Sequence, residues 1–258
     1  MIEEPYRWVE AISNRREYVE HQLATGSPIA ALTYKNGILF FTLGRERQKI
    51  FEIYDRIAMG GIGHPGDIER LRMTAIEVTS TEGFTRSSQD VSLRRLANYS
   101  LSPALKAAFE QIYGAPFLAR MLFAELGRGT DPNLFVRVEY DGSLHSNGGA
   151  LARAFENFGV ISGTQRSTQM MENFLREKDA SALYLPDALQ IAFDAWAVGH
   201  LALTADENDS PPSLESIAEH RKTQVADAVI EAAVLERSGQ LPITFRNLGG
   251  EELSAIRG

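Results

Sequence analysis

The amino-acid sequence predicts an α+β fold of four layers, in which two β-sheets lie face to face and a pair of helices covers each outer side. The prediction rests on the order of the segments: strands, two helices, strands, two helices and strands. Strand groups separated by helix pairs do not form the strand–helix–strand units of a parallel sheet, so stacked sheets are favoured. The 258 residues contain no internal repeat, and we expect one domain spanning residues 1–258.

The first element expected is a helix over residues 8–24, preceded by a tail of residues 1–7 and ended by Gly26. Its apolar residues fall on one narrow stripe, made by Trp8, Ile12, Val19 and Leu23. Such a stripe suits packing within the same chain and also docking against a neighbouring subunit. The pattern leaves both interpretations open.

Two pairs of strands are expected next. Asn36-Gly37 lies between two apolar runs, and Asn-Gly is the strongest short-range signal of a β-hairpin. Residues 49–61, KIFEIYDRIAMGG, alternate well enough to predict a second strand pair with a turn near Tyr54-Asp55.

A pair of helices is predicted to follow these strands. The first covers residues 65–81, where apolar side chains recur at helical spacing after Pro65. Residues 81–88, TEGFTRSS, are interpreted as a break, and the second helix covers about residues 90–113. Pro103 lies inside the second helix and is expected to kink or split it.

The second half of the chain repeats this order of strands and helices. Its predicted strands are 117–127, 134–142, a short pair within 143–164, 227–236 and 243–248. Its predicted helices are 165–178, 184–203 and a short helix at the C-terminus. Residues 204–213, TADENDSPPS, are polar, acidic and contain proline, so they predict a loop.

Charge and composition narrow the classes of function. Lys and Arg number 26 against 34 Asp and Glu, and the net charge of −8 argues against a nucleic-acid partner. The absence of cysteine excludes disulfides and thiolate metal sites and fits a cytoplasmic protein. The acidic start, MIEEPYRWVE, does not resemble a signal peptide, and no apolar run approaches the roughly 18 residues of a membrane span, so no membrane partner is expected.

No cofactor and no metal ion are expected either. Residues 61–66, GIGHPG, match the G-x-G-x-x-G pattern of dinucleotide-binding loops, but Pro65 removes an N–H that would face a phosphate. The helix that follows leads to another helix rather than to a parallel strand. The histidines are separated by twenty residues or more, so none has the i, i+4 spacing of a helical metal site.

Ser27 and Lys49 form the one pattern that suggests catalysis. Ser27 opens the first strand and Lys49 opens the third, as the nucleophile and a lysine do in self-processing N-terminal nucleophile hydrolases. That chemistry requires a free α-amine on residue 27, yet 26 residues precede it, and Pro28 is unusual beside a reacting centre. These residues therefore suggest either a nucleophile released by processing or its inert counterpart.

Several of these segments together resemble a bacterial proteasome α-type subunit of the actinobacterial kind. They are GSPIAALTYKNGILFF, QKIFEIYDRIAMGGIGHPGDIERLRMTA, LFVRVEYDGSL and IEAAVLERSGQLPITFRNLGGEEL. The most specific stretch is KIFEIYDRI, followed by a Gly-rich strand and a helix that begins GDIERLR. The short link between Leu43 and Lys49 resembles α chains rather than β chains, and the resemblance covers about residues 8–256.

The resemblance implies a fold, an assembly and partners. The fold is the four-layer αββα sandwich of N-terminal nucleophile hydrolases and proteasome subunits. The chain would form a homo-oligomeric, seven-membered α ring on a ring of proteasome β-type subunits, and only the β-type subunits would cleave peptide bonds. Residues 1–7 would help to gate the axial pore, the helix 8–24 would lie on the outer face of the ring, and a ring-shaped AAA ATPase would be a further partner.

The resemblance also assigns a partner-binding site. Lys49 matches a lysine that lines a pocket between neighbouring α chains and holds the C-terminal carboxylate of the ATPase. Gly63 and His64 would form the floor of that pocket. From the residues alone, Lys49 could instead form a structural ion pair with Asp55 or Glu46.

No catalytic residue is expected from the resemblance. Ser27 stands where β-type subunits carry a threonine nucleophile, and α-type subunits keep the segment ahead of it. Leu43 falls near the position of the carboxylate that orients the lysine, and a leucine cannot do so. We expect a non-catalytic subunit that gates substrate access and docks an ATPase for protein degradation. A self-processing peptidase using Ser27 and an α-like ring scaffold without a proteolytic partner are the alternatives.

Overall fold

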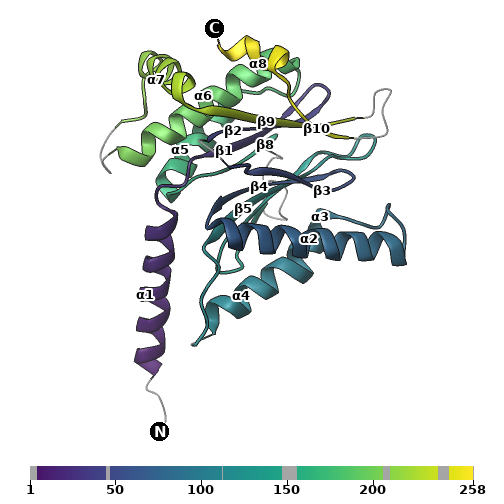
Figure 1. The fold of residues 1–258 in the computed structure, drawn as a ribbon, viewed down its shortest axis with the longest axis vertical. Coiled ribbons are helices and arrows are strands. Elements are labelled where there is room, and N and C mark those ends of the chain that lie inside the picture. The colour runs from purple at the N-terminus through teal and green to yellow at the C-terminus, as the bar shows by residue number, and fades with distance from the viewer. Residues whose placement is uncertain are drawn as a thin grey trace.

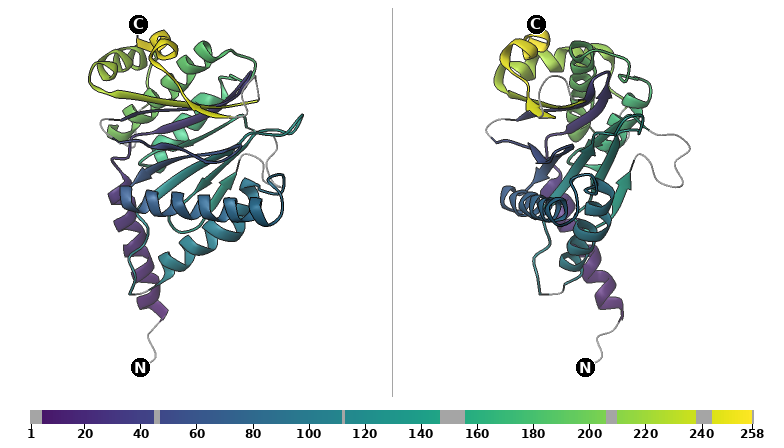
Figure 2. Two further views of the ribbon diagram at one scale, coloured as in Figure 1. Left: turned by 45° about the vertical axis from the view of Figure 1, so that its right-hand side comes forward. Right: turned by 90° about the vertical axis from the view of Figure 1, so that its right-hand side faces the viewer.

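The computed structural model describes residues 5–44, 47–111, 113–146, 156–205, 210–237 and 244–257. Two five-stranded sheets lie face to face, and helices cover the outer side of each (Figures 1 and 2). The predicted four-layer sandwich is therefore confirmed.

Both sheets are antiparallel throughout. The first contains β1 (Ile29–Tyr34), β2 (Gly37–Gly44), β8 (Phe158–Ile161), β9 (Val229–Glu236) and β10 (Phe245–Asn247). The second contains β3 (Ile50–Tyr54), β4 (Ile57–Gly63), β5 (Ala119–Glu125), β6 (Leu134–Val138) and β7 (Leu144–Ser146). The strand orders are β10-β9-β2-β1-β8 and β3-β4-β5-β6-β7.

The helices divide between the two outer faces. The first sheet carries α5 (Gln165–Arg176), α6 (Leu185–Thr204), α7 (Leu214–Asp227) and α8 (Gly250–Arg257). The second carries α2 (Pro65–Thr85), α3 (Leu93–Arg95), a π-helix (Leu96–Leu101) and α4 (Ser102–Glu110). Helix α1 (Pro5–Leu23) stands apart from both layers and projects from one end of the molecule (Figure 1).

Strand β2 shows how one strand serves two apolar cores. Ile38 and Phe40 lie in the core between the sheets, whereas Leu39 and Phe41 face the helices of the first sheet. Phe41 packs against Phe193 of α6, with ring centroids 5.3 Å apart. Because successive side chains of a strand point to opposite faces, a strand buried on both sides needs a continuous apolar run.

The predicted hairpin at Asn36-Gly37 is confirmed. Tyr34 pairs with Gly37 at the end of the antiparallel β1–β2 ladder. Residue 37 has to be glycine, because a Cβ at this position would overlap the carbonyl oxygen of Leu235 on β9. The same residue thus closes the turn and allows the next strand to approach.

The predicted helix bounds need three corrections. Helix α1 begins at Pro5, so the expected tail of residues 1–7 loses its last three residues to the helix, and residues 1–4 lie outside the described chain.

Helix α2 continues through the expected break to Thr85, where Gly83 lets the helix approach the Tyr54 hydroxyl. The predicted single helix 90–113 is α3, the π-helix and α4 in succession, and Pro103 lies in the first turn of α4, directly after the π-helix.

Helix α7 was not predicted, and its sequence explains the omission. Ile217 is the side chain that it buries in the core, so its apolar periodicity is weak. The start of α7 did carry a local signal. The Ser213 hydroxyl accepts a hydrogen bond from the Ser216 N–H at 3.2 Å, as expected of an N-cap. The loop predicted at 204–213 therefore ends at that cap, and residues 206–209 lie outside the described chain.

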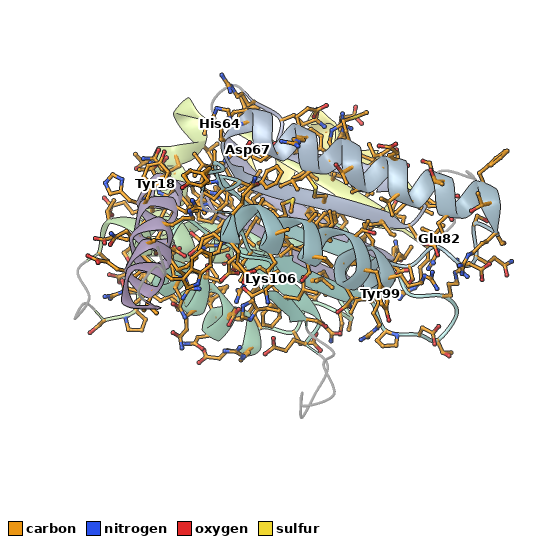
Figure 3. All side chains as sticks on the ribbon, turned by 90° about the horizontal axis from the view of Figure 1, so that it is seen from below. Tyr18, His64, Asp67, Glu82, Tyr99 and Lys106 are labelled. Atoms are coloured by element: carbon orange, nitrogen blue, oxygen red, sulfur yellow. The ribbon has the colours of Figure 1, made fainter. Side chains whose placement is uncertain are left out.

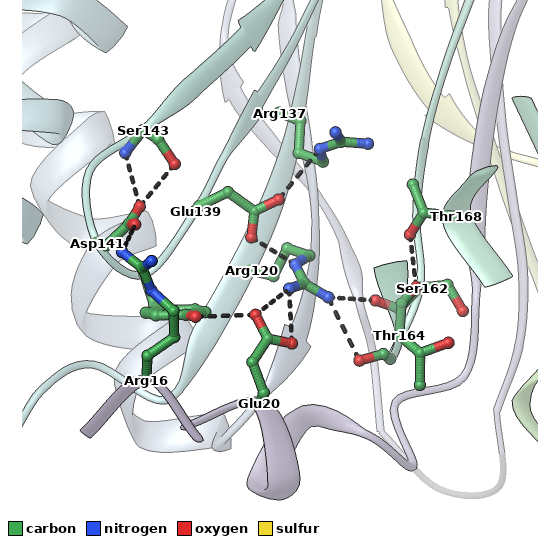
Figure 4. A network of polar contacts seen from close by, with 12 residues as sticks. Arg16, Glu20, Arg120, Arg137, Glu139, Asp141, Ser143, Ser162, Thr164 and Thr168 are labelled. Atoms are coloured by element: carbon green, nitrogen blue, oxygen red, sulfur yellow. Dashed lines mark hydrogen bonds and ion pairs between the residues drawn. The ribbon is translucent and has the colours of Figure 1, made fainter. Parts of the chain in front are cut away.

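A buried arginine joins three distant parts of the chain (Figure 4). Arg120 on β5 donates to Glu139 Oε2 at 2.5 Å and to Glu20 Oε1 on α1 at 3.1 Å. A further N–H of Arg120 donates to the carbonyl oxygen of Ser162 at 2.7 Å, just after β8. The Arg120 side chain is only 5% exposed, so these acceptors replace the water that the guanidinium would otherwise bind.

Apolar contacts anchor the same half of α1. Val19 and Leu23 pack with Phe109 of α4 and with Tyr140. Arg15 donates to the carbonyl oxygen of Phe109 at 2.6 Å, near the C-terminus of α4, where carbonyl groups lack helical partners. The C-terminal half of α1 is therefore fixed to the body, while Trp8 and Val9 near its other end are exposed.

We predict that Arg120→Ala lowers the free energy of unfolding by about 3–5 kcal/mol, because it leaves the half-buried Glu139 without its buried partner. Urea unfolding of the isolated subunit measures this change. The matched control is Arg16→Ala, since Arg16 pairs with Asp141 on the same side of α1 but its side chain is 56% exposed. The control should cost less than about 1 kcal/mol, and equal losses in the two variants would contradict the prediction.

Candidate functional site

A cavity with a volume of about 1000 Å3 lies at the end of the sandwich where α1 meets the sheets. Its walls come from the end of α1, the starts of β1, β3 and α2, the end of β4, and helices α6 and α7. Ser27, Lys49, Gly63 and His64 all line it. The structure thus brings these four residues to one cavity.

Ser27 uses its hydroxyl as a structural bridge. Its Oγ donates to the carbonyl oxygen of Leu43 on β2 at 2.7 Å and accepts from Trp196 Nε1 on α6 at 3.2 Å. A nucleophilic serine needs a base that accepts its hydroxyl proton. Here the Ser27 O–H instead donates its hydrogen bond to a backbone carbonyl oxygen, which cannot act as that base. The backbone nitrogen of Ser27 is also part of the continuous chain that runs on from α1.

Lys49 is half-buried at the residue before β3. Burial lowers the pKa of Lys49, and the negative charge of Glu231 on β9 opposes that shift. Among the described residues, no carboxylate lies within ion-pair distance of the Lys49 Nζ, and Asp55 is instead next to Arg56, with 4.0 Å between carboxylate and guanidinium. The alternative pairing with Glu46 concerns a residue outside the described chain.

Gly63 and His64 form the turn between β4 and α2. Gly63 has a φ of +121°, and a Cβ there would overlap the carbonyl oxygen of Leu118, so a side chain is excluded on both grounds. The His64 N–H donates to the same carbonyl at 2.7 Å, and the Leu118 N–H donates to Asp67 Oδ2 at 2.9 Å. Figure 3 places His64 and Asp67 at the start of α2, where these bonds hold the turn. The His64 side chain itself is exposed.

The structure argues against a nucleotide-binding role for GIGHPG. Gly61 and Gly63 lie in β4, which pairs antiparallel with both β3 and β5. A dinucleotide-binding loop follows a parallel strand whose neighbours run in the same direction. The cradle for a pyrophosphate is therefore missing at this turn.

Two histidines that the sequence did not connect lie on the α6 side of the cavity. His200 Nδ1 is 2.9 Å from His220 Nε2, and Trp196 stacks on both rings. Burial lowers the pKa of His220. The spacing of Trp196 and His200 by one helical turn was the only local signal of this stack. Within the described part of the chain, no group of three or more His, Cys, Asp or Glu residues is placed to hold a metal ion.

None of the described helices is both long and apolar enough to cross a membrane.

Comparison with known proteins agrees with this geometry. The profile of the family described as "Proteasome subunit" matches residues 23–195. The chain is 29% identical over 249 residues to "Proteasome subunit alpha" of Frankia casuarinae, covering 96% of this chain and 92% of the relative. It is 27% identical to the protein of the same description from Kineococcus radiotolerans, covering 96% of this chain and 94% of the relative. A third relative, from Streptomyces avermitilis, is 25% identical, covering 96% of this chain and 87% of its own. The resemblance stated from the sequence is confirmed.

Proposed function

The chain belongs to the proteasome subunit family, and from this premise we propose that it is a non-catalytic α-type subunit of a bacterial proteasome core particle. It forms an outer ring in the cytoplasm, gates the access of substrates, and docks a ring-shaped AAA ATPase. The observation that carries the proposal is one cavity lined by Lys49, Gly63 and His64, in which the Lys49 ammonium has no ion pair with any of the described residues.

The polar contacts of Ser27 support the absence of catalysis. Its hydroxyl bridges β2 and α6 through Leu43 and Trp196, so it contributes to the wall of the cavity rather than to a reaction. Leu43 supplies a carbonyl oxygen there, while its side chain lies in the apolar core of the first sheet. The partner that would orient Lys49 for catalysis is thus replaced by an apolar residue.

The charge and burial of Lys49 support carboxylate docking. An ammonium on a flexible stem suits one carboxylate, and partial burial weakens the screening by water that makes exposed pairs ineffective. Glu69 also lines the cavity, but its carboxylate is engaged by Arg72 at 2.7 and 2.8 Å. The C-terminal carboxylate of an ATPase subunit is the ligand that fits this arrangement.

The placement of α1 supports a gating role and a ring. The helix projects from the body, packs on it from Ile12 to Leu23, and exposes Trp8 and Val9. Exposed apolar side chains of this size suit contacts with neighbouring α subunits, and we assign the ring, with seven members, to that contact. Phe84 of α2 and Tyr99 of the π-helix are exposed on the helix layer of the second sheet (Tyr99 is labelled in Figure 3), and we assign this second surface to the β-type ring.

We predict that Ser27→Ala leaves peptide hydrolysis by the assembled core particle unchanged. The variant should lose about 1–2 kcal/mol of unfolding free energy, because the Trp196 N–H loses its acceptor. Fluorogenic-peptide assays and urea unfolding measure the two effects. Loss of residues 1–26 from the wild-type chain, read by intact mass, together with loss of hydrolysis in the variant would favour the self-processing peptidase instead.

We predict that Lys49→Ala weakens binding of the ATPase on the order of tenfold to a hundredfold, since a charge-assisted hydrogen bond contributes about 1.5–3 kcal/mol. Binding is measured by biolayer interferometry on rings whose assembly is checked by negative-stain microscopy. Lys35→Ala is the matched control, because Lys35 lies at the hairpin turn of β1 and contacts Tyr184 on the surface. Normal binding by the Lys49 variant would refute the docking assignment.

We predict that deletion of residues 1–7 raises the basal hydrolysis of short peptides, because it removes the segment assigned to the gate and the first turn of α1. Deletion of residues 1–4 alone leaves α1 intact and separates the contribution of the tail from that of the helix. Unchanged hydrolysis in both variants would show that these residues do not occlude a channel. If no β-type subunit copurifies with the wild-type ring, the chain is better described as a ring scaffold.

A further inference from the structure

Glu231 connects the two sheets at the base of the cavity wall that carries Lys49. It belongs to β9 of the first sheet, but its carboxylate reaches the start of β3 in the second. Oε1 accepts from the Ile50 N–H at 2.8 Å, and both oxygens accept from the Lys49 N–H, at 3.0 and 2.9 Å. No other side chain in the described residues hydrogen-bonds to these two amides.

These bonds hold the Glu231 carboxylate in place. Its oxygens bind rigid backbone groups, and charge-assisted bonds of this kind are stronger than neutral ones. The Lys49 carbonyl in turn accepts from the Gly61 N–H at 3.0 Å. Both backbone polar groups of Lys49, its N–H and its carbonyl, are therefore held by hydrogen bonds. Glu231 is therefore placed to fix where the Lys49 side chain begins.

The charge of the same carboxylate acts on the Lys49 ammonium. The two groups influence each other's protonation, since burial lowers the pKa of Lys49 and raises the pKa of Glu231, and the charge of each opposes the shift of the other. Yet the Glu231 carboxylate and the Lys49 Nζ do not form an ion pair within 4 Å in the described structure. Glu231 opposes the loss of the ammonium charge without an ion pair, and within the described part of the chain no carboxylate pairs with the Lys49 Nζ.

We infer that Glu231 is a positioning residue for carboxylate docking at Lys49: it fixes the start of β3 and places a negative charge near the half-buried ammonium without forming an ion pair with it. This inference rests on the proposed docking function of the cavity. A residue that only joined the two sheets would have no influence on the pH dependence of docking, and this difference separates the two roles.

The sign of the pH effect follows from the charges. Glu231→Gln keeps an oxygen acceptor for the backbone but removes the negative charge, so the pKa of Lys49 falls further and the ammonium is lost at a lower pH. The same substitution removes a charge that repels an incoming carboxylate. Docking to E231Q should therefore equal or exceed wild-type docking where Lys49 is fully protonated, and fall below it as the pH rises.

Other charged or titratable groups line the cavity, and the pH series for the docking measurement is chosen to keep their changes in charge small. They are Arg47 ahead of β3, His64 and Glu69 on the α2 side, and His200 on α6. Histidines in water titrate near pH 6.5, so a series from about pH 7.5 to about pH 10 keeps their contribution small and reports on the lysine.

The experiment uses the assembled core particle and a fluorescein-labelled heptapeptide with a free C-terminal carboxylate, with the C-terminally amidated peptide as reference. The ratio of the Kd of E231Q to that of the wild type should rise about tenfold over this pH series, as expected for a pKa change of about one unit. Glu236→Gln is the matched control, since Glu236 lies on the same strand but pairs with Tyr34 and Arg246 away from the cavity. Its ratio should stay constant.

Two outcomes overturn the inference in distinguishable ways. A Kd ratio for E231Q that does not change with pH would leave docking intact and make Glu231 a purely structural clamp. Equal binding of the carboxylate and amide peptides by the wild-type particle would remove the proposed docking function, and the inference with it.

A second measurement decides the question if E231Q rings do not assemble. The rate of Lys49 acetylation by acetic anhydride, read by mass spectrometry across the same pH series, follows the deprotonated amine and requires only the folded subunit. The Lys49 midpoint should move to lower pH in E231Q, while the midpoint of Lys35 in the same chain stays fixed. Coincident Lys49 profiles in the two chains would overturn the inference.

Discussion

The position of helix α1 depends on the buried guanidinium of Arg120. This one side chain connects Glu20 of α1, Glu139 beyond β6 and the carbonyl oxygen of Ser162 ahead of α5. A charge in so dry a place is tolerated only if its donors find acceptors, and the acceptors come from segments far apart in the sequence. Because α1 leads directly through Gly26 to Ser27, the wall of the cavity is positioned by the same contact.

The end of the sandwich that holds the cavity illustrates how one fold serves different chemistry. Ser27 and Lys49 occupy the places of a nucleophile and its lysine, but the hydroxyl of Ser27 is engaged by Leu43 and Trp196 as a bridge between layers. Among the described residues, no side-chain base accepts the proton of the Ser27 hydroxyl, and the docking that we propose uses the charge of Lys49 for binding instead. The proposed function therefore rests on these local contacts rather than on the fold.

The sequence predicted the elements whose pattern is local. The β1–β2 hairpin and helix α6 were predicted because turn residues or apolar periodicity mark them. Helix α7 was missed because its burial is slight, and the π-helix because nothing in the sequence marks a change of helical pitch. Lys49, Gly63 and His64 came from the resemblance, whereas Glu231 and the stack of His200 with His220 arise from contacts between distant segments. In the sequence, the one sign of the Glu231 contact was the position of this glutamate inside the apolar strand 229–236, because a half-buried carboxylate needs hydrogen-bond donors.

Arg120 and Lys49 show two ways of placing a cation in the interior. Arg120 is almost fully buried and its charge is matched by two carboxylates, so it can bind nothing further. Lys49 is half-buried, and the carboxylate of Glu231, whose charge acts on it, is held by the backbone amides of Lys49 and Ile50 rather than by the ammonium. A docking ammonium has to be dry enough for its bond to a ligand to be strong and near enough to a negative charge to stay protonated. The Glu231 carboxylate, held by backbone N–H groups, meets both requirements in the docking that we propose. Its charge favours the protonated form of Lys49, and it does not compete with the ligand carboxylate for the ammonium.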